Sequence, residues 1–160
     1  SRGDGALKQM VDYVHANGGS AVAVQDVPHA QTGSYGIVAT DAFDGPAGKI
    51  HAIVEKPHPD VAPSNLAVVG RYVLDPAIFD LLETTPKGAG GEIQLTDAIA
   101  ALLASQRVDA FRFHGTRFDC GTHLGLIEAT IRYALDNEKL SDAARELMRN
   151  ALSEMGVKES

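Results

Sequence analysis

The spacing of apolar residues predicts a helix at the start of the chain and a strand directly after it. Over residues 5–17 apolar side chains recur at helical intervals: Leu7, Met10, Val11 and Val14. This spacing is typical of a helix with one buried face, and Gly18-Gly19 favours its end. The run SAVAVQDVP comes next and is rich in valine, as in a strand buried on both faces.

The middle of the chain carries further strand patterns. YGIVAT at 35–40 is one, and DGPAGKIHAIVEKP predicts a turn and a return strand, because apolar residues alternate there. NLAVVGRYVL at 65–74 is the strongest strand signal. Gly70 interrupts it, which indicates either a bulge or a close approach of another group to the backbone.

The remaining segments alternate between helix and strand patterns. Asp75-Pro76 predicts the start of a short helix, and another helix is expected from about Leu95 or Thr96. VDAFRFHG at 108–115 alternates like a strand, and the residues from His123 to 140 have helical spacing, as do 141–155. We therefore expect an α/β domain with a mixed β-sheet flanked by helices.

Composition limits the classes of function without identifying one. The chain has 160 residues, 44% of them hydrophobic, and a net charge of −7, which argues against a general affinity for nucleic acid or anionic membranes. It has no apolar run of the roughly 18–20 residues that a membrane span needs. A single cysteine cannot form an internal disulfide, so a cytoplasmic location is expected.

The stretch RFDCGTHLG at 117–125 gathers several reactive side chains. Asp119 is expected where a strand ends and a helix begins, and it suits either a Mg²⁺ ligand or a helix N-cap, with the cap favoured by spacing alone. Cys120 would be a nucleophile only with a general base such as His123 nearby. A small core residue is the more common role of such a cysteine.

Two other stretches carry polar groups in patterns that suit ligand binding. In VEKP, Glu55 could accept hydrogen bonds from hydroxyls while Lys56 meets a phosphate, although two solvated charges explain the pattern equally well. The glycines of GAGGE at 88–92 could present backbone amides to a phosphate, but the stretch is not a P-loop. A flexible loop with Glu92 as an early helix acid is the simpler interpretation.

The order of these motifs strongly resembles a known enzyme family. APSNLAVVGRY, GAGGEIQLTDAI, VEKP and RFDCG occur in the same order in the bacterial UTP–glucose-1-phosphate uridylyltransferases, or UDP-glucose pyrophosphorylases. The resemblance covers most of the chain, to about residue 140. The first two motifs separate that family from its thymidylyl- and adenylyltransferase relatives, which share only looser elements.

The resemblance implies part of a Rossmann-like nucleotidyltransferase fold. Residues 1–140 would be the C-terminal, sugar-binding part of that domain, and residues 141–160 a C-terminal helical tail. The nucleotide-binding half, with its Gly-rich GTR loop and first Mg²⁺-binding aspartate, is expected to precede residue 1. This chain alone is therefore expected to be inactive and to expose a sheet edge and apolar surface.

The resemblance also implies a reaction and a set of site residues. Glucose 1-phosphate attacks the α-phosphorus of UTP in line, giving UDP-glucose and pyrophosphate, with Mg²⁺ as cofactor. Asp119 matches a Mg²⁺ ligand, and Lys56 and His123 are the expected catalytic cations. The expected substrate-binding residues are Gly36, Glu55, Lys56, Asn65, Gly70 and Glu92.

One site position departs from the family pattern. Where the family usually has a phosphate-contacting lysine, this chain has His123. Histidine is only partly charged near neutral pH, so weaker phosphate binding or a steeper pH dependence is expected. A transferase that uses dTTP and a non-catalytic sugar-phosphate-binding module are the alternatives. A homo-oligomer is expected from the family, which serves carbohydrate metabolism.

Overall fold

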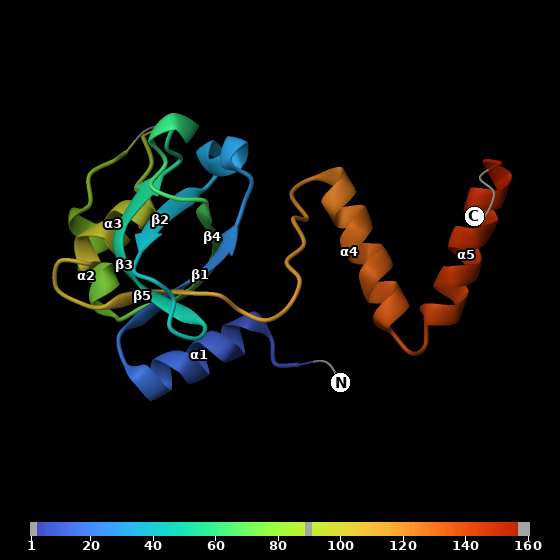
Figure 1. Ribbon diagram of the computed structural model, residues 1–160, viewed down its shortest axis with the longest axis horizontal. Coiled ribbons are helices and arrows are strands. Elements are labelled where there is room, and N and C mark those ends of the chain that lie inside the picture. Colours follow the sequence, from blue (N-terminus) through green and yellow to red (C-terminus); the bar gives the residue numbers. More distant parts are fainter. Residues whose placement is uncertain (1–2, 89–90, 157–160) are drawn as a thin grey trace. The chain divides into compact units, whose positions relative to one another are not determined.

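The chain folds as two compact units. A computed structural model describes residues 3–88 and 91–156 (Figure 1). The units are Ser1–Gly115 and Thr116–Ser160. We expected a boundary after residue 140, between a sugar-binding part and a helical tail. The division into compact units does not test sugar binding, so that boundary stays a prediction.

The first unit is built on a mixed sheet that closes into a barrel. Its strands are β1 (Ser20–Asp26), β2 (Gly36–Thr40), β3 (Ala47–Glu55), β4 (Leu66–Val73) and β5 (Val108–Phe111). Around the barrel their order is β1-β4-β2-β3-β5. Strand β5 pairs parallel with β1 and antiparallel with β3, and the other neighbours are antiparallel. The mixed sheet is confirmed. The expected free sheet edge is wrong for the described strands, because β5 pairs on both sides.

Helices cover the sheet in two places, as Figure 1 shows. Helix α1 (Ala6–Asn17) lies on one side, and α2 (Ala77–Thr84) and α3 (Leu95–Leu102) lie together on another. Two short 3-10 segments, η1 (His29–Ser34) and η2 (Pro59–Val61), lie beside each other. The predicted helix at 5–17 and the helix near residue 95 are confirmed.

The alternation within β1 decides how the two groups of helices pack. Val22 and Val24 belong to the larger core, which includes residues of α2 and α3. Ala21 and Ala23 belong to a second core with Met10 of α1. Because successive strand residues face opposite sides, β1 is buried on both faces, as predicted. The small alanine side chains leave room for α1 to approach the strand closely.

Gly70 marks a bulge in β4. Val22 of β1 pairs with Tyr72, whereas Val24 pairs with Val68, so β4 carries extra residues between two β1 partners. Gly70 adopts a φ of +72°, in the left-handed region that favours glycine, and no heavy atom lies within 4 Å of the position its Cβ would take. The predicted bulge is therefore confirmed, and the backbone conformation is what calls for glycine.

The strand expected at 108–115 is shorter than predicted, because β5 ends at Phe111. Beyond it a side chain replaces the strand partner. Gln9 of α1 donates from its Nε2 to the His114 carbonyl oxygen, at 2.8 Å. Its Oε1 accepts from the His114 amide, also at 2.8 Å. His114 is thus held by α1, whereas the Arg112 amide still donates to the Pro46 carbonyl oxygen beside β3.

Up to residue 156, the second unit contains two helices. They are α4 (His123–Asp136) and α5 (Ser141–Glu154), and they contact each other. Helix α4 ends before the expected residue 140, because Asn137 turns the chain and its Oδ1 accepts from the Lys139 amide. Among the helices that lie within residues 3–88 and 91–156, none is both long and apolar enough to cross a membrane.

Candidate functional site

Glu55 and Gly36 face each other across two strands. Gly36 opens β2, Glu55 closes β3, and the two are register partners. The Glu55 carboxylate is half-buried, and its Oε2 accepts a hydrogen bond of 3.0 Å from the Thr96 hydroxyl. Thr96 lies in the first turn of α3. Three separate segments therefore meet at one carboxylate.

Gly36 is required by space. A Cβ at this position would lie 2.8 Å from Thr96 Cγ2 and 3.2 Å from Glu55 Oε2. Any larger residue would displace the threonine or the carboxylate. The glycine therefore allows α3 to lie close to the end of β3, which is a different role from the expected contact with sugar; that contact remains a prediction.

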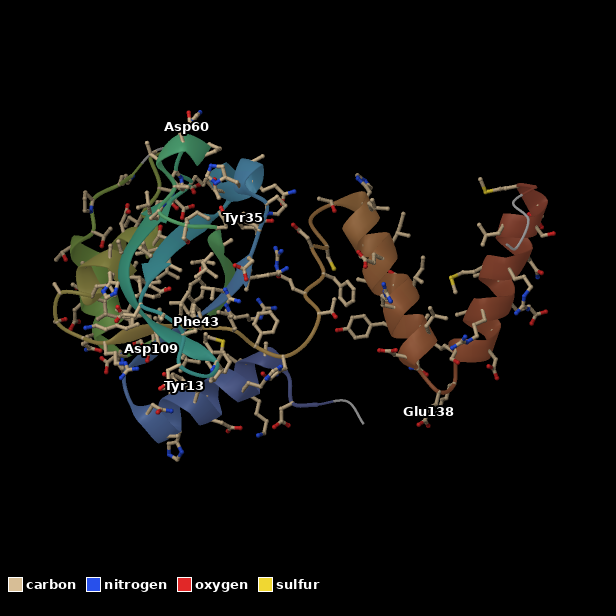
Figure 2. All side chains as sticks on the ribbon, viewed as in Figure 1. Tyr13, Tyr35, Phe43, Asp60, Asp109 and Glu138 are labelled. Atoms are coloured by element: carbon tan, nitrogen blue, oxygen red, sulfur yellow. The ribbon has the colours of Figure 1, made fainter. Side chains whose placement is uncertain are left out.

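Lys56 has an unusual backbone conformation that changes where its side chain points. Its φ is +44°, and within the described residues it is the one non-glycine residue with a positive φ. Its amide donates to the Tyr35 carbonyl oxygen at 3.0 Å (Tyr35 is labelled in Figure 2). Consecutive residues of a regular strand face opposite sides. Here the Lys56 ammonium lies 3.6 Å from Glu55 Oε1, so the two charged groups are close enough to contact one ligand.

Tyr72 of β4 contributes to the electrostatics around Glu55. Burial raises the pKa of the Tyr72 phenol, and the negative charge of Glu55 raises it further. The phenol therefore stays neutral beside the carboxylate at ordinary pH. We call Gly36, Glu55, Lys56 and Thr96 the Glu55 cluster, with Tyr72 at its border.

The other expected sugar-side residues lie outside the contacts of this cluster. Asn65 interacts with His29, whose Nδ1 lies 3.1 Å from Asn65 Oδ1. Gly70 is exposed at the bulge of β4. Glu92 is exposed in the loop before α3, and its carbonyl oxygen accepts from the Gly88 amide. Ala89 and Gly90 of the GAGGE stretch, whose glycines could present amides to a phosphate, lie outside the described residues.

Asp119 lies in the second unit and does not cap a helix. The N-cap of α4 is Thr122, whose Oγ1 accepts from the Gly125 amide at 3.1 Å. The interpretation of Asp119 as N-cap is therefore wrong, because the helix begins at His123. Its expected place at a strand end is also wrong, since β5 already ends at Phe111.

The Asp119 carboxylate is oriented by its own loop. Its Oδ1 accepts from the Gly121 amide at 3.1 Å, and its Oδ2 lies 3.5 Å from Arg117 Nη2. A side chain at Gly125 would collide with the Asp119 carbonyl oxygen, so that glycine lets α4 pack against the loop. Asp119 is thus held in place while its side chain stays 48% exposed.

Asp119 fits a metal that takes most of its ligands from elsewhere. Mg²⁺ commonly binds through one or two carboxylates, and water and phosphate oxygens complete its shell. A half-exposed carboxylate suits this mode. The described residues hold no group of three or more His, Cys, Asp or Glu side chains that could bind a metal by themselves.

His123 and Cys120 lie near Asp119 in the chain. His123 is the first residue of α4 and is exposed, so its ring is accessible to an anion. Cys120 is also exposed, and its interpretation as a buried core residue is wrong, because it lies in the loop that precedes the cap of α4.

Thr96 is the site residue that the sequence analysis missed. It is buried, although threonine is polar. Along α3 it precedes Ile99 by three positions, so it lies on the apolar face of the helix. A lone hydroxyl on an apolar helix face was the signal that could have identified it, because a buried hydroxyl needs a partner.

The Glu55 cluster has the chemistry of a site for a polar, anionic ligand. A fixed carboxylate accepts hydrogen bonds from hydroxyl groups, and the neighbouring ammonium attracts a negative charge. In the second unit, Asp119 and His123 offer a metal ligand and a donor to phosphate. Each unit taken by itself thus carries groups that suit part of a phosphorylated, hydroxyl-rich molecule.

Comparison with protein families matches residues 3–135 to the Nucleotidyl transferase family. The UTP–glucose-1-phosphate uridylyltransferase of Staphylococcus epidermidis is 47% identical over 136 residues, which is 85% of this chain and 47% of that protein. The enzyme of the same name from Pseudomonas aeruginosa is 48% identical over 128 residues, 80% of this chain and 46% of its own length. The chain spans about half the length of the curated relatives it matches.

A solved structure shares both the fold and much of the sequence. It is a UDP-glucose pyrophosphorylase complexed with UDP-glucose, with a TM-score of 0.80 and 37% sequence identity. The match covers 86% of this chain and 52% of that one.

Proposed function

This chain belongs to the nucleotidyltransferase family, and on that premise we propose that it is the sugar-binding part of a UTP–glucose-1-phosphate uridylyltransferase. The full-length protein would transfer a uridylyl group from UTP to glucose 1-phosphate. The observation that carries the proposal is the identity of 47% with an enzyme of that name, combined with the Glu55 cluster. A non-catalytic sugar-phosphate-binding module would have no need of a metal carboxylate such as Asp119, which its own loop orients through the Gly121 amide.

The proposed reaction is a single in-line displacement. A phosphate oxygen of glucose 1-phosphate forms a bond to the α-phosphorus of UTP. The bond from that phosphorus to the bridging oxygen of the β-phosphate breaks, and pyrophosphate leaves with the electron pair. Such a reaction requires alignment of the two phosphates and neutralisation of their charge, and little covalent work by the protein.

The Glu55 cluster would bind the sugar side of this reaction. Glu55 accepts hydrogen bonds from glucose hydroxyls, and Lys56 attracts the phosphate of the same molecule. The separation of 3.6 Å between their charged atoms lets one ligand contact both. Each hydrogen bond to such a charged group contributes about 1.5–3 kcal/mol when buried from water.

Asp119 and His123 would act on the phosphate side. Asp119 would hold Mg²⁺, which supplies charge neutralisation for the phosphates when bound. The Asp119 loop keeps one carboxylate oxygen on the Gly121 amide, which fixes the orientation of the group. His123 at the start of α4 donates a hydrogen bond to a phosphate oxygen.

The test is pyrophosphorolysis by the full-length gene product with Mg²⁺, with UDP-glucose and dTDP-glucose offered in parallel. A strong preference for UDP-glucose, lost on addition of EDTA and restored by Mg²⁺, is the expected result. Preference for dTDP-glucose would support the thymidylyl alternative. Turnover of neither, with the protein folded, would overturn the proposed activity.

A cytoplasmic location and a homo-oligomeric state complete the proposal. The family resemblance motivates both, and exposed apolar side chains on α5, such as Leu147 at 71% exposure, offer a surface for self-association. Light scattering on the full-length protein measures the oligomeric state. A monomeric mass at micromolar concentration would contradict that part of the proposal.

A further inference from the structure

Within residues 3–88 and 91–156, the hydrogen bond to the Glu55 side chain comes from the Thr96 hydroxyl. Thr96 Oγ1 donates to Glu55 Oε2 at 3.0 Å, and the other oxygen, Oε1, faces Lys56 Nζ at 3.6 Å. The two oxygens therefore have separate tasks. One is fixed by an internal donor, and the other faces the exposed Lys56 ammonium.

Thr96 itself is fixed by the core. It is 6% exposed, and the following residues of α3 that face the sheet are fully buried: Ala98, Ile99 and Leu102. Helix α3 contacts β3, the strand that ends at Glu55. The hydroxyl is thus part of a rigid element, whereas a free glutamate side chain samples several rotamers.

The methyl group of Thr96 packs against the backbone at Gly36. A Cβ on residue 36 would lie only 2.8 Å from Thr96 Cγ2, so the absence of that Cβ leaves room for the methyl group. Both substituents of the threonine are therefore used, the hydroxyl on Glu55 and the methyl against the Gly36 backbone. Serine would keep the first contact and valine the second, which makes the two substitutions complementary probes.

We propose that Thr96 is a positioning residue: its hydroxyl orients the Glu55 carboxylate so that the carboxylate receives the sugar hydroxyls without first becoming ordered. The inference rests on the proposed function, because it concerns the same sugar subsite. A carboxylate that is already oriented loses less freedom on binding, so the benefit is to affinity for the sugar ligand.

The experiment compares Thr96→Val and Thr96→Ser in the full-length gene product, by steady-state pyrophosphorolysis of UDP-glucose. Thr96→Val is expected to raise KM for UDP-glucose about 10-fold, the effect of one hydrogen bond to a charged group. KM for pyrophosphate should stay within about 2-fold, because that ligand does not meet Glu55. Thr96→Ser should restore KM for UDP-glucose to within about 3-fold of the wild type.

A matched control separates this effect from general loss of stability. Thr85→Val removes a half-buried hydroxyl that donates to the Leu81 carbonyl oxygen at 2.7 Å, at the end of α2. It should lower the melting temperature without changing KM for UDP-glucose. Thr96→Val combined with Glu55→Ala should be no worse than Glu55→Ala alone, since the hydroxyl acts through that carboxylate.

The outcomes distinguish the two proposals. An active wild type in which Thr96→Val leaves KM for UDP-glucose unchanged, or in which valine and serine are equally impaired, overturns the positioning role alone. An inactive wild type overturns the proposed function, and the positioning role with it.

Discussion

The Tyr13 hydroxyl donates a hydrogen bond of 2.9 Å to the Asp109 carboxylate, which is fully buried (both residues are labelled in Figure 2). Arg107 Nε lies 2.9 Å from both carboxylate oxygens. The contact joins α1 to β5 across 96 positions of sequence. A buried carboxylate is costly unless it is paired, so these donors are what permits it there.

Tyr13→Phe should therefore destabilise the first unit. We expect a loss of about 1–2 kcal/mol, because Asp109 keeps Arg107 but loses one donor. Thermal or urea unfolding measures the change. Tyr133→Phe in the second unit is the control for loss of a tyrosine hydroxyl. An unchanged midpoint for Tyr13→Phe would show that Arg107 alone satisfies the carboxylate.

The same tyrosine predicts how stability depends on alkaline pH. Burial raises the pKa of Tyr13, and the hydrogen bond to Asp109 raises it further. The folded state thus keeps the phenol proton to a higher pH than the unfolded chain. The stabilisation of the folded state by the protonated Tyr13 phenol is therefore complete below about pH 10, and it is lost as pH rises through the folded-state pKa. Above about pH 10, the melting temperature of Tyr13→Phe should decrease less steeply with pH than that of the wild type. An equal decrease in both proteins would refute the role of the Tyr13 proton in stability.

Lys56→Gly should separate stability from activity. A left-handed backbone costs a non-glycine residue free energy, so glycine at this position should stabilise the fold by about 0.5–1 kcal/mol. Activity should fall about 10- to 100-fold in kcat/KM, because the cation is lost. Lys56→Ala is the control: it should lose the same activity and gain no stability. Equal urea midpoints for the two variants would mean that the left-handed backbone at position 56 does not destabilise the fold.

Gly36→Ala should disturb the Glu55 cluster by overpacking. The new Cβ would meet Thr96 Cγ2 at 2.8 Å, and we expect a loss of stability. The cost should be about 1–3 kcal/mol, with a raised KM for UDP-glucose. Gly33→Ala is the control, since the nearest atom to its Cβ would be the Pro57 carbonyl oxygen at an ordinary 3.5 Å. A Gly36→Ala variant as stable and active as Gly33→Ala would mean that α3 shifts without cost.

Thr122→Ala should loosen the start of α4. Loss of an N-cap side chain typically costs about 1 kcal/mol, and here the Gly125 amide would lose its acceptor. Hydrogen exchange of the Gly125 and Leu126 amides should become faster. Thr130→Ala, in the same helix but away from its start, should leave those amides unchanged. Equal exchange in both variants would mean that the cap contributes nothing measurable.

His123→Lys should make phosphate binding less dependent on pH. Lysine is charged throughout the neutral range, whereas an ordinary histidine loses its charge above about pH 6.5. Activity of the full-length variant, relative to wild type, should therefore be higher at about pH 8 than at about pH 6. Pyrophosphorolysis at both pH values measures the ratio. An activity ratio that does not change with pH would show that His123 does not contact the phosphate.

The features that follow local patterns were predicted well. The valines and alanines of β1 alternate between two cores, and Gly70 marks the bulge that its interruption of β4 indicated. Such features depend on residue spacing within a single element. The motif order also led to the family.

Features that depend on distant partners were not predicted. Beyond the end of β5, His114 is held by the Gln9 side chain, 105 positions away, and nothing within 108–115 reveals this partner. Thr96 and Glu55 are 41 positions apart, and only the fold brings them together. Lys56 follows the end of β3 with a left-handed backbone, which the alternating pattern of the strand does not reveal.

Closure of the sheet has a consequence for folding of the protein during synthesis on the ribosome. The strand that completes the ring, β5, is among the last parts of the first unit to be synthesised, and both β1 and β3 must wait for it. Until then each has an unpaired edge, which can recruit strands of other nascent chains. Contacts between such distant segments also form slowly, so the interval of exposure is long. This part of the protein is therefore vulnerable to aggregation until β5 has paired with both strands.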